Sequence, residues 1–266
     1  MVHAQNSEDR DLAEAARSLL EAHHRDTPLL LANIWDAASA RVVEAAGFAF
    51  IATSSHAIAD VLGEADDDSS DAGLIFGWIA RIARAVSCPV TVDLEAGYGL
   101  APEELVSRML AAGVVGCNLE DTDHHGDGPL VDPDRQASFL SAVRAAGDAA
   151  GVHIVINARV DSFLRHVGNE TQQLEQAIRR GRLYLAAGAD CIYPMELSDR
   201  TTIVELVDTL PGPVNILARR GGPQVDELAA LGVQRISLAS GLHRLTTERL
   251  RDAAEALIAG SGLDQL

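Results

Sequence analysis

The sequence predicts an α/β protein of the (β/α)8 TIM-type barrel class, built as a single domain over residues 1–266. Eight short apolar segments, each typical of a buried strand, alternate with helix-like segments at spacings of about 25 to 35 residues. Eight such units in one chain of 266 residues fit a barrel better than an open doubly wound sheet. No GxGxxG motif follows the first strand, which argues against a dinucleotide-binding fold.

The composition supports a core of parallel strands and excludes several kinds of partner. Hydrophobic residues make up 47% of the chain but aromatic residues only 4%, so Ala, Val, Leu and Ile must form the core. The net charge of −18 argues against nucleic acid and anionic membrane as partners. No apolar run reaches the roughly 20 residues of a membrane helix, and residues 1–10 lack the apolar region of a signal peptide. We therefore expect a cytoplasmic protein that acts on a small molecule.

The expected elements follow from periodicity and from helix start and stop signals. An amphipathic helix over 13–23 lies in an N-terminal extension, 1–28, and the C-terminal helical segment covers about 240–266. Apolar stretches predict strands at 29–33, 48–52, 90–93, 114–119, 153–157, 190–193, 214–217 and 235–238. Capping residues such as Asp36, an early Pro such as Pro102, and stops such as Gly47 and Gly113 predict the helices. These helices are expected at 36–46, 74–86, 102–112, 133–150, 172–187, 201–210, 225–231 and 242–259.

Two polar segments after strands should be the least ordered parts of the chain. One is the Asp-rich stretch 64–73, and the other is the stretch 121–132, rich in Gly, Asp and His. Both would lie at the C-terminal mouth of the barrel, where barrel enzymes carry their lids. A third polar cluster, 53–56, is expected on a loop from strand to helix. The cysteines, Cys88, Cys117 and Cys191, are far apart in apolar segments and are expected to be reduced, structural thiols.

The two carboxylates that end the third strand indicate a cation site. Asp93 and Glu95 alternate with apolar residues before the glycine turn 97–99, so a strand period of two directs both side chains the same way. Like charges on one face repel each other and are costly to dehydrate. No Lys or Arg lies between Arg84 and Arg108 to compensate them. A divalent metal is therefore the natural counter-charge.

The residues that follow the other strands extend this site, because strand ends converge at one mouth of a barrel. They are Asn33, Trp35, Asp36, Ser54, Ser55, His56, Asn118, Glu120, Asp121, Asn157, Arg159, Asp161, Glu196, Asn215 and Ser237. Oxygen ligands without a Cys or His cluster suit Mg²⁺ or Mn²⁺, and Asp93, Glu95 and Glu120 are the expected metal set. Asp36 and Asp161 are expected only to cap helices. Arg159 either binds an anion or neutralises a neighbouring acid.

Candidates for proton transfer are fewer. His124 and His125 are adjacent on the mobile loop, where they either act as acid and base or are merely solvated. Tyr98 either donates a proton or packs the glycine turn. Ser54 and Ser55 lack a His/Asp constellation in the sequence, so covalent serine catalysis is not expected.

Together these segments resemble the isocitrate lyase/phosphoenolpyruvate mutase superfamily. The most specific are Asp-Leu-Glu-Ala-Gly-Tyr-Gly at 93–99 and Asn-Leu-Glu-Asp at 118–121; 33–41, 53–55 and 157–161 add to them, and the likeness runs from about Leu29 to Leu245. The resemblance implies an α/β barrel that binds Mg²⁺ and cleaves or forms C–C or P–C bonds beside a 2-oxo acid. It also implies a homodimer or homotetramer that exchanges a C-terminal helix between subunits.

The resemblance assigns roles residue by residue. Asp93 would be the direct metal ligand, while Glu95, Glu120 and Asp66 would hold metal-bound waters. The substrate carboxylate would lie against Ser54, Ser55 and His56, and Arg159 would bind a carboxylate or phosphoryl group. Trp35, Asn118 and Asn215 complete the expected substrate-binding set, and Arg159, Tyr98, His124 and His125 the expected catalytic set.

The loop after Glu120 departs from the family and decides the expected reaction. Isocitrate and methylisocitrate lyases carry a Cys there that protonates the leaving enolate, and the phosphonate enzymes carry a Lys; residues 121–130 contain neither. We therefore expect an Mg²⁺-dependent lyase that cleaves a C–C bond of a small 2-oxo or 2-hydroxy acid through a metal-stabilised enolate. The alternatives are a mutase or hydrolase acting on a P–C bond, with a phosphonate as substrate, and a metal- and carboxylate-binding barrel that has lost catalysis.

Overall fold

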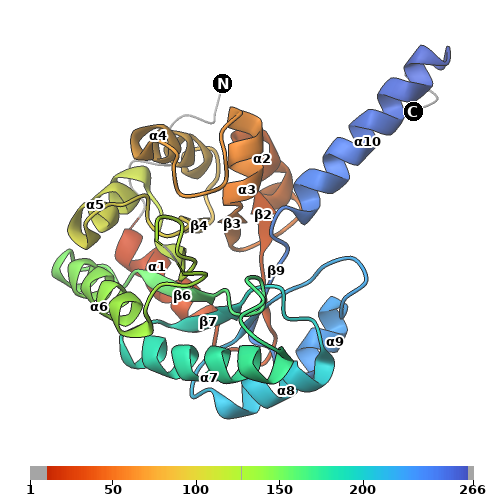
Figure 1. Ribbon diagram of the computed structural model, residues 1–266. Coiled ribbons are helices and arrows are strands. Elements are labelled where there is room, and N and C mark those ends of the chain that lie inside the picture. Colours follow the sequence, from red (N-terminus) through yellow and green to blue (C-terminus); the bar gives the residue numbers. More distant parts are fainter. Residues whose placement is uncertain (1–10, 127, 263–266) are drawn as a thin grey trace.

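The computed structural model describes residues 11–126 and 128–262, in which parallel strands form a ring inside a layer of helices (Figure 1). The strands are β1 (Leu29–Leu30), β2 (Ala32–Ile34), β3 (Ile51–Thr53), β4 (Val90–Asp93), β5 (Gly116–Glu120), β6 (Val155–Val160), β7 (Cys191–Pro194), β8 (Asn215–Leu217) and β9 (Arg235–Ser237). The helices are α1 (Leu12–Ala22), α2 (Ala37–Ala45), α3 (Ser55–Leu62), α4 (Ala72–Ala83), α5 (Pro102–Ala112), α6 (Pro133–Ala149), α7 (Glu170–Ala186), α8 (Arg200–Thr209), α9 (Val225–Ala230) and α10 (Gly241–Ile258).

All strand pairs between named strands are parallel, and their order is that of a TIM-type barrel. Hydrogen bonding runs continuously through β2-β3-β4-β5-β6-β7 and through β1-β9-β8. A single parallel bridge between Ile192 and Val214 joins β7 to the start of β8. On the other side, β1 continues through Leu31 into β2, so the two sheets meet there as one extended segment. The predicted fold class is confirmed, as two adjoining sheets rather than one unbroken ladder.

Burial of the strands on both faces explains their composition. Of the nine described strands, six are buried at every residue, and β-branched and aliphatic side chains supply most of the core. Helices begin at the expected caps: the Asp36 side chain accepts from the backbone N–H of Ser39 at 2.7 Å, as predicted. The core thus fixes the strand ends, and with them the mouth of the barrel.

The N-terminal helix α1 closes the end of the barrel opposite the mouth. Its Leu19 is fully buried and lies against the first residue of β5, Gly116. A Cβ added at Gly116 would lie 2.9 Å from Leu19 Cδ2 and 2.9 Å from Thr91 Oγ1, which real contacts do not allow. Glycine is therefore required for α1 to form this floor. The remainder of the predicted extension, residues 1–10, lies outside the described residues.

Three predictions about the first elements are corrected by the structure. The first predicted strand is divided into β1 and β2, and the second lies at Ile51–Thr53 rather than 48–52. The polar cluster 53–56 is not a loop, because helix α3 begins at Ser55. Ser54 caps this helix by accepting from the N–H of Ala57 at 3.3 Å. His56 consequently lies in the first turn of a helix.

The last helix, α10, extends away from the barrel (Figure 1). None of its described residues is buried, although it carries apolar side chains along its length. The final residues of the predicted C-terminal segment, 263–266, and Asp127 of the 121–132 loop lie outside the described residues. Within the described part, no helix is both long and apolar enough to cross a membrane.

Candidate active site

The mouth of the barrel gathers the predicted acidic residues. Asp93, at the end of β4, accepts a hydrogen bond from the hydroxyl of Ser55 at 3.1 Å through Oδ2. Its other oxygen, Oδ1, is buried and has no hydrogen-bond partner among the described residues. Burial raises the pKa of Asp93; the positive charge of Arg159 opposes this rise and the nearby Asp66 adds to it. A carboxylate oxygen in this state is suited to a cation.

Glu95 follows in the turn after β4, with its backbone in the left-handed region at φ 50°. The side chain is 4% exposed, and Oε2 accepts from the N–H of Asp68 at 2.5 Å. Burial raises the pKa of Glu95 to about 8, against the effect of the Asp68 hydrogen bond and with further increases from Asp66, Asp93 and Glu120. These four acids are close enough to disfavour ionisation of Glu95, and together they form a site of strong negative potential.

Asp68 is a member of the site that the sequence did not single out. It is buried, with φ 60°, and its Oδ1 accepts from the N–H groups of Ala96 at 3.1 Å and Tyr98 at 2.8 Å. Asp68 therefore ties the Asp-rich segment to the glycine turn. The predicted Asp66 lies two residues earlier, with Oδ2 at 3.3 Å from Nδ1 of His56. The run of three Asp residues was a signal for this segment, but their identical side chains gave no basis for ranking them.

Backbone strain is concentrated at this turn. Glu95, Asp68 and Tyr98 all adopt positive φ, which non-glycine residues rarely do. Such strained conformations persist only where the surrounding structure holds the backbone in place, and they are most common at functional sites. Tyr98 is largely buried, and burial together with Glu95 and Asp93 raises its pKa well above the ordinary value. The hydroxyl therefore stays protonated, as either of its predicted roles requires.

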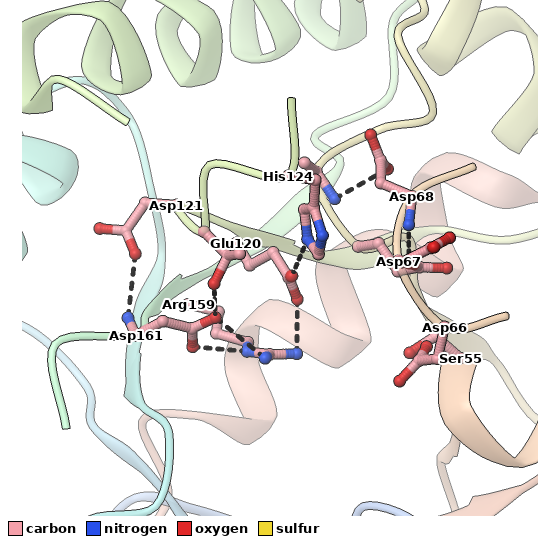
Figure 2. A network of polar contacts seen from close by, with 12 residues as sticks. Ser55, Asp66, Asp67, Asp68, Glu120, Asp121, His124, Arg159 and Asp161 are labelled. Carbon is pink, nitrogen blue, oxygen red and sulfur yellow. Dashed lines mark hydrogen bonds and ion pairs between the residues drawn. The ribbon is translucent and has the colours of Figure 1, made fainter. Parts of the chain in front are cut away.

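Glu120, at the end of β5, is held between a histidine and an arginine (Figure 2). Its Oε1 lies 2.6 Å from Nε2 of His124, and its Oε2 lies 2.5 Å from Nη1 of Arg159. Burial raises the pKa of Glu120, while Arg159 and the His124 contact lower it. Of the three predicted metal acids, Glu120 is thus the one that forms ion pairs with other described side chains.

The two histidines of the 121–132 loop have different environments. The His124 side chain is 14% exposed, and its contact with Glu120 raises its pKa above the ordinary value. His125 is 66% exposed, with Nε2 at 3.5 Å from Oδ2 of Asp68. The interpretation of both residues as solvated is wrong for His124, because the loop folds back over the end of its own strand.

Arg159 is fixed by a bidentate contact with Asp161 (Figure 2). Its Nε and Nη2 donate to the two oxygens of Asp161 at 2.7 and 2.9 Å. Burial acts against the charge of Arg159, but Asp161, Glu120 and Asp93 outweigh it and keep the pKa well above the ordinary value. The prediction that Asp161 only caps a helix is wrong: it is fully buried, and α7 begins nine residues later, at Glu170.

Asp161 is itself positioned by a buried network. It accepts from the hydroxyl of Thr122 at 2.6 Å, and its N–H donates to Asp121 at 2.9 Å. Asp121 in turn accepts from Arg180 at 3.0 Å and from the hydroxyl of Tyr184 at 2.8 Å. Helix α7 thus helps to fix the orientation of the guanidinium at the mouth.

The remaining predicted residues are distributed around this centre. The carbonyl of Trp35 accepts from the indole N–H of Trp78 at 2.7 Å, and its ring meets the His243 ring edge-on at 4.8 Å between centroids. Asn118 lies deeper, with its amide oxygen accepting from Asn157 at 2.8 Å and from Arg235 at 3.2 Å. Asn215 is fully buried, and neither of its amide atoms has a partner among the described residues.

The geometry fits a hard cation held by few protein ligands. Among residues 11–126 and 128–262, no three acidic, His or Cys side chains are placed as a ready-made metal cage. Mg²⁺ does not need one, because it usually binds one or two carboxylates and keeps several waters. Oδ1 of Asp93, which has no partner among the described residues, could bind such a cation directly. Glu95 and Glu120 are close enough to interact with Asp93 electrostatically and could hold the waters of the cation.

An α/β barrel with polar and charged side chains gathered at the carboxyl ends of its strands defines the class of barrel enzymes, whose active sites lie at that mouth. The profile of the phosphoenolpyruvate phosphomutase family matches residues 19–258, and the chain belongs to this family. An uncharacterized Mycobacterium tuberculosis protein is 30% identical, covering 92% of this chain and 91% of its own. An oxaloacetate decarboxylase of Rhodopseudomonas palustris is 27% identical, with coverages of 97% and 88%.

Solved structures agree with this assignment. A Burkholderia cenocepacia protein, provisionally assigned as a phosphonomutase, is 37% identical, has a TM-score of 0.85, and aligns over 91% of this chain and 99% of its own. A 2,3-dimethylmalate lyase of the PEP mutase/isocitrate lyase superfamily is 25% identical, with a TM-score of 0.81 and coverages of 95% and 90%. The predicted superfamily is confirmed.

Proposed function

We propose that this protein is an Mg²⁺-dependent lyase that cleaves a C–C bond of a small 2-oxo or 2-hydroxy carboxylic acid by way of an enolate. The observation that carries the proposal is the buried Oδ1 of Asp93, which has no hydrogen-bond partner among the described residues and belongs to a group of acids with raised pKa within electrostatic reach of the fixed Arg159. Relatives named oxaloacetate decarboxylase and dimethylmalate lyase act, by their names, on substrates of this kind.

Asp93 would hold the cation directly, and Glu95, Glu120 and Asp66 would hold its waters. When bound, Mg²⁺ (or Mn²⁺) would supply Lewis-acid stabilisation of the negative charge that develops on the enolate oxygen. The chain's own residues orient the substrate. Arg159 would pair with a carboxylate, and the N-terminus of α3, with Ser54, Ser55 and His56, would receive the carboxylate beside the metal.

His124 is the best-placed group to return a proton to the enolate carbon. Its ring is largely shielded, lies beside Glu120, and has a raised pKa, so a protonated form is available near neutral pH. His125 is far more exposed and touches only Asp68 among the described acids. We therefore assign the acid role to His124 and a lesser one to His125.

The second candidate function, a P–C bond enzyme, is favoured by the provisional phosphonomutase among the solved relatives. Against it, the loop after Glu120 has no lysine, and the whole chain has none. The third candidate is a binding barrel without catalysis. It requires the same metal site as the lyase, so only a turnover assay can distinguish the two.

One experiment tests all three candidate functions. Thermal unfolding is measured with Mg²⁺, with oxalate (a planar mimic of the pyruvate enolate), and with both together. The metal-enolate proposal requires the pair to stabilise the protein beyond either component, and an absent joint effect would refute it. Turnover on a panel of oxaloacetate, methylisocitrate, 2,3-dimethylmalate and phosphonopyruvate then separates lyase from P–C enzyme, and stabilisation without any turnover favours the binding barrel.

We further propose that the protein is a homo-oligomer that exchanges α10 between subunits. The helix stands away from its own barrel (Figure 1), and its apolar Leu250, Leu257 and Ile258 are exposed. A groove of about 700 Å³ lies at its base, beside the segment after β8. Sedimentation of the wild type and of the double variant L250D/I258D tests this: a monomeric wild type contradicts the exchange, and a monomeric variant beside an oligomeric wild type supports it.

A further inference from the structure

Beneath the acidic mouth, the barrel contains a buried arginine that the proposed reaction does not use. Arg235, the first residue of β9, is 1% exposed. Its Nη2 donates to the amide oxygen of Asn118 at 3.2 Å, and its Nη1 lies 3.4 Å from Nε2 of His23. Burial, with Arg235 as the second cause, lowers the pKa of His23 to about 4, so that imidazole is neutral at pH 7. The guanidinium of Arg235 therefore contacts only uncharged groups among its described hydrogen-bond partners, close to the end of the barrel that α1 closes.

No described carboxylate forms an ion pair with Arg235, in contrast to the other largely buried arginines. Arg144 pairs with Asp190 at 2.6 Å, and Arg180 pairs with Asp121 at 3.0 Å. Arg159 has two acidic partners. Asp93 is near enough to interact with Arg235 electrostatically but not to touch it, and in the proposed function it serves the metal. A buried charge normally has a partner, because removing it from water without one is strongly unfavourable.

Polar atoms without a described hydrogen-bond partner occur on Arg235 itself, on its strand neighbour Asn215, and on Asn157, which shares the acceptor Asn118 with Arg235. The Nε of Arg235, both amide atoms of Asn215 and Oδ1 of Asn157 are buried without a described hydrogen-bond partner. Asn215 is the directly paired neighbour of Arg235 in the parallel β8–β9 ladder. Paired residues of neighbouring strands direct their side chains to the same face of the sheet, so the two side chains share the barrel interior. Buried polar groups of native proteins rarely lack partners, and these therefore indicate a ligand.

We propose that Arg235 and Asn215 bind a monovalent anion inside the barrel, below the metal site. The donors are guanidinium and amide N–H groups, and the single uncompensated charge selects an ion of charge −1. A halide and one carboxylate group share this chemistry. The unpartnered acceptor on Asn157 would receive a water that accompanies the anion. The site stands independently of the proposed lyase reaction, because no metal or turnover is needed to fill it.

The test is an anion titration of the full-length protein without metal. Chloride-free protein in methanesulfonate is unfolded thermally while bromide replaces methanesulfonate at constant ionic strength. We expect a saturable rise of about 4 °C at tenfold the dissociation constant. The variant R235M, which keeps an apolar side chain of similar length, should lose this rise. The control R108M removes an exposed arginine that pairs with Glu104 and should retain it.

Crystals soaked in bromide provide a readout that does not depend on the variant folding. An anomalous peak between Arg235 and Asn215 supports the site, whereas ordered water there, with no bromide-dependent stabilisation, overturns it. Adding succinate separates the two sources of the anion. Displacement of bromide would show that the site takes the carboxylate of an organic ligand, and bromide persisting beside succinate would show a resident inorganic ion.

Discussion

Replacing Glu95 by Gln should stabilise the metal-free protein at alkaline pH. Burial and neighbouring acids raise the pKa of Glu95 from its ordinary 4.5 to about 8, so the folded chain binds this proton more tightly than the unfolded chain does. The stabilising effect of the proton is complete below pH 4.5 and is lost as pH rises towards 8. Each unit by which the pKa is raised corresponds to about 1.4 kcal/mol in the free energy of unfolding. Ionisation of Glu95 therefore lowers the free energy of unfolding by at most about 5 kcal/mol.

The glutamine of E95Q would keep a carboxamide oxygen to accept from the N–H of Asp68 but could not ionise. At pH 8 in EDTA we therefore expect E95Q to unfold about 5 to 15 °C above the wild type, since 1 kcal/mol shifts the melting temperature of such a domain by about 2 to 4 °C. The difference should shrink at pH 5.5. Lower pH is avoided because the isoelectric point is about 4.7. Mg²⁺ should raise the wild type more than the variant and so narrow the gap.

The control is E103Q, which removes an exposed carboxylate in the first turn of α5 and should not reproduce the alkaline stabilisation. Two results would refute the reasoning. One is an E95Q protein less stable than wild type at pH 8 without metal. The other is a difference that does not change between pH 5.5 and 8, which would mean that ionisation of Glu95 is not its cause.

Four further predictions concern the metal site and the reaction. D93A should abolish the Mg²⁺-dependent thermal shift, whereas C117S should leave activity largely intact because that thiol is buried; an inactive C117S protein would contradict this structural role. D161N should lower kcat/KM about 10- to 100-fold by releasing the guanidinium it holds bidentately, and an unchanged value would exclude this positioning. H124Q should reduce kcat about 100-fold or more and remove the fall of kcat at alkaline pH, where a general acid loses its proton, while H125Q should change kcat little; equal effects would contradict our assignment.

The sequence was sufficient for the architecture because strand and helix signals alternate regularly along the chain, even though several predicted boundaries were shifted. Period-two alternation before a glycine turn located Asp93 and Glu95, and the strand-end rule added Glu120 and Arg159. The sequence did not predict α3. Ser54 is equally suited to a polar loop and to a helix cap, and only tertiary packing decides between the two.

The missing parts of the site depend on contacts between distant segments. Asp68 differs from its two Asp neighbours only in the path of the loop that brings it to the glycine turn. His124 looks solvated until the loop is known to fold over β5. The isolation of Arg235 is a property of the tertiary fold, because its neighbours come from β5, from β8 and from His23 at the end of α1. No local pattern in the sequence carries this information.

The structure also refines the expectation that acids at one strand end need a cation. Glu120 obtains compensation from the chain itself, through Arg159 and His124. Asp93 and Glu95 form no ion pair among the described residues, and both have raised pKa values. A divalent cation therefore gains most at these two carboxylates, so removal of either should weaken Mg²⁺ binding more than E120Q does. If E120Q proved the most damaging of the three in a Mg²⁺ titration by calorimetry, the metal would lie nearer β5 than we propose.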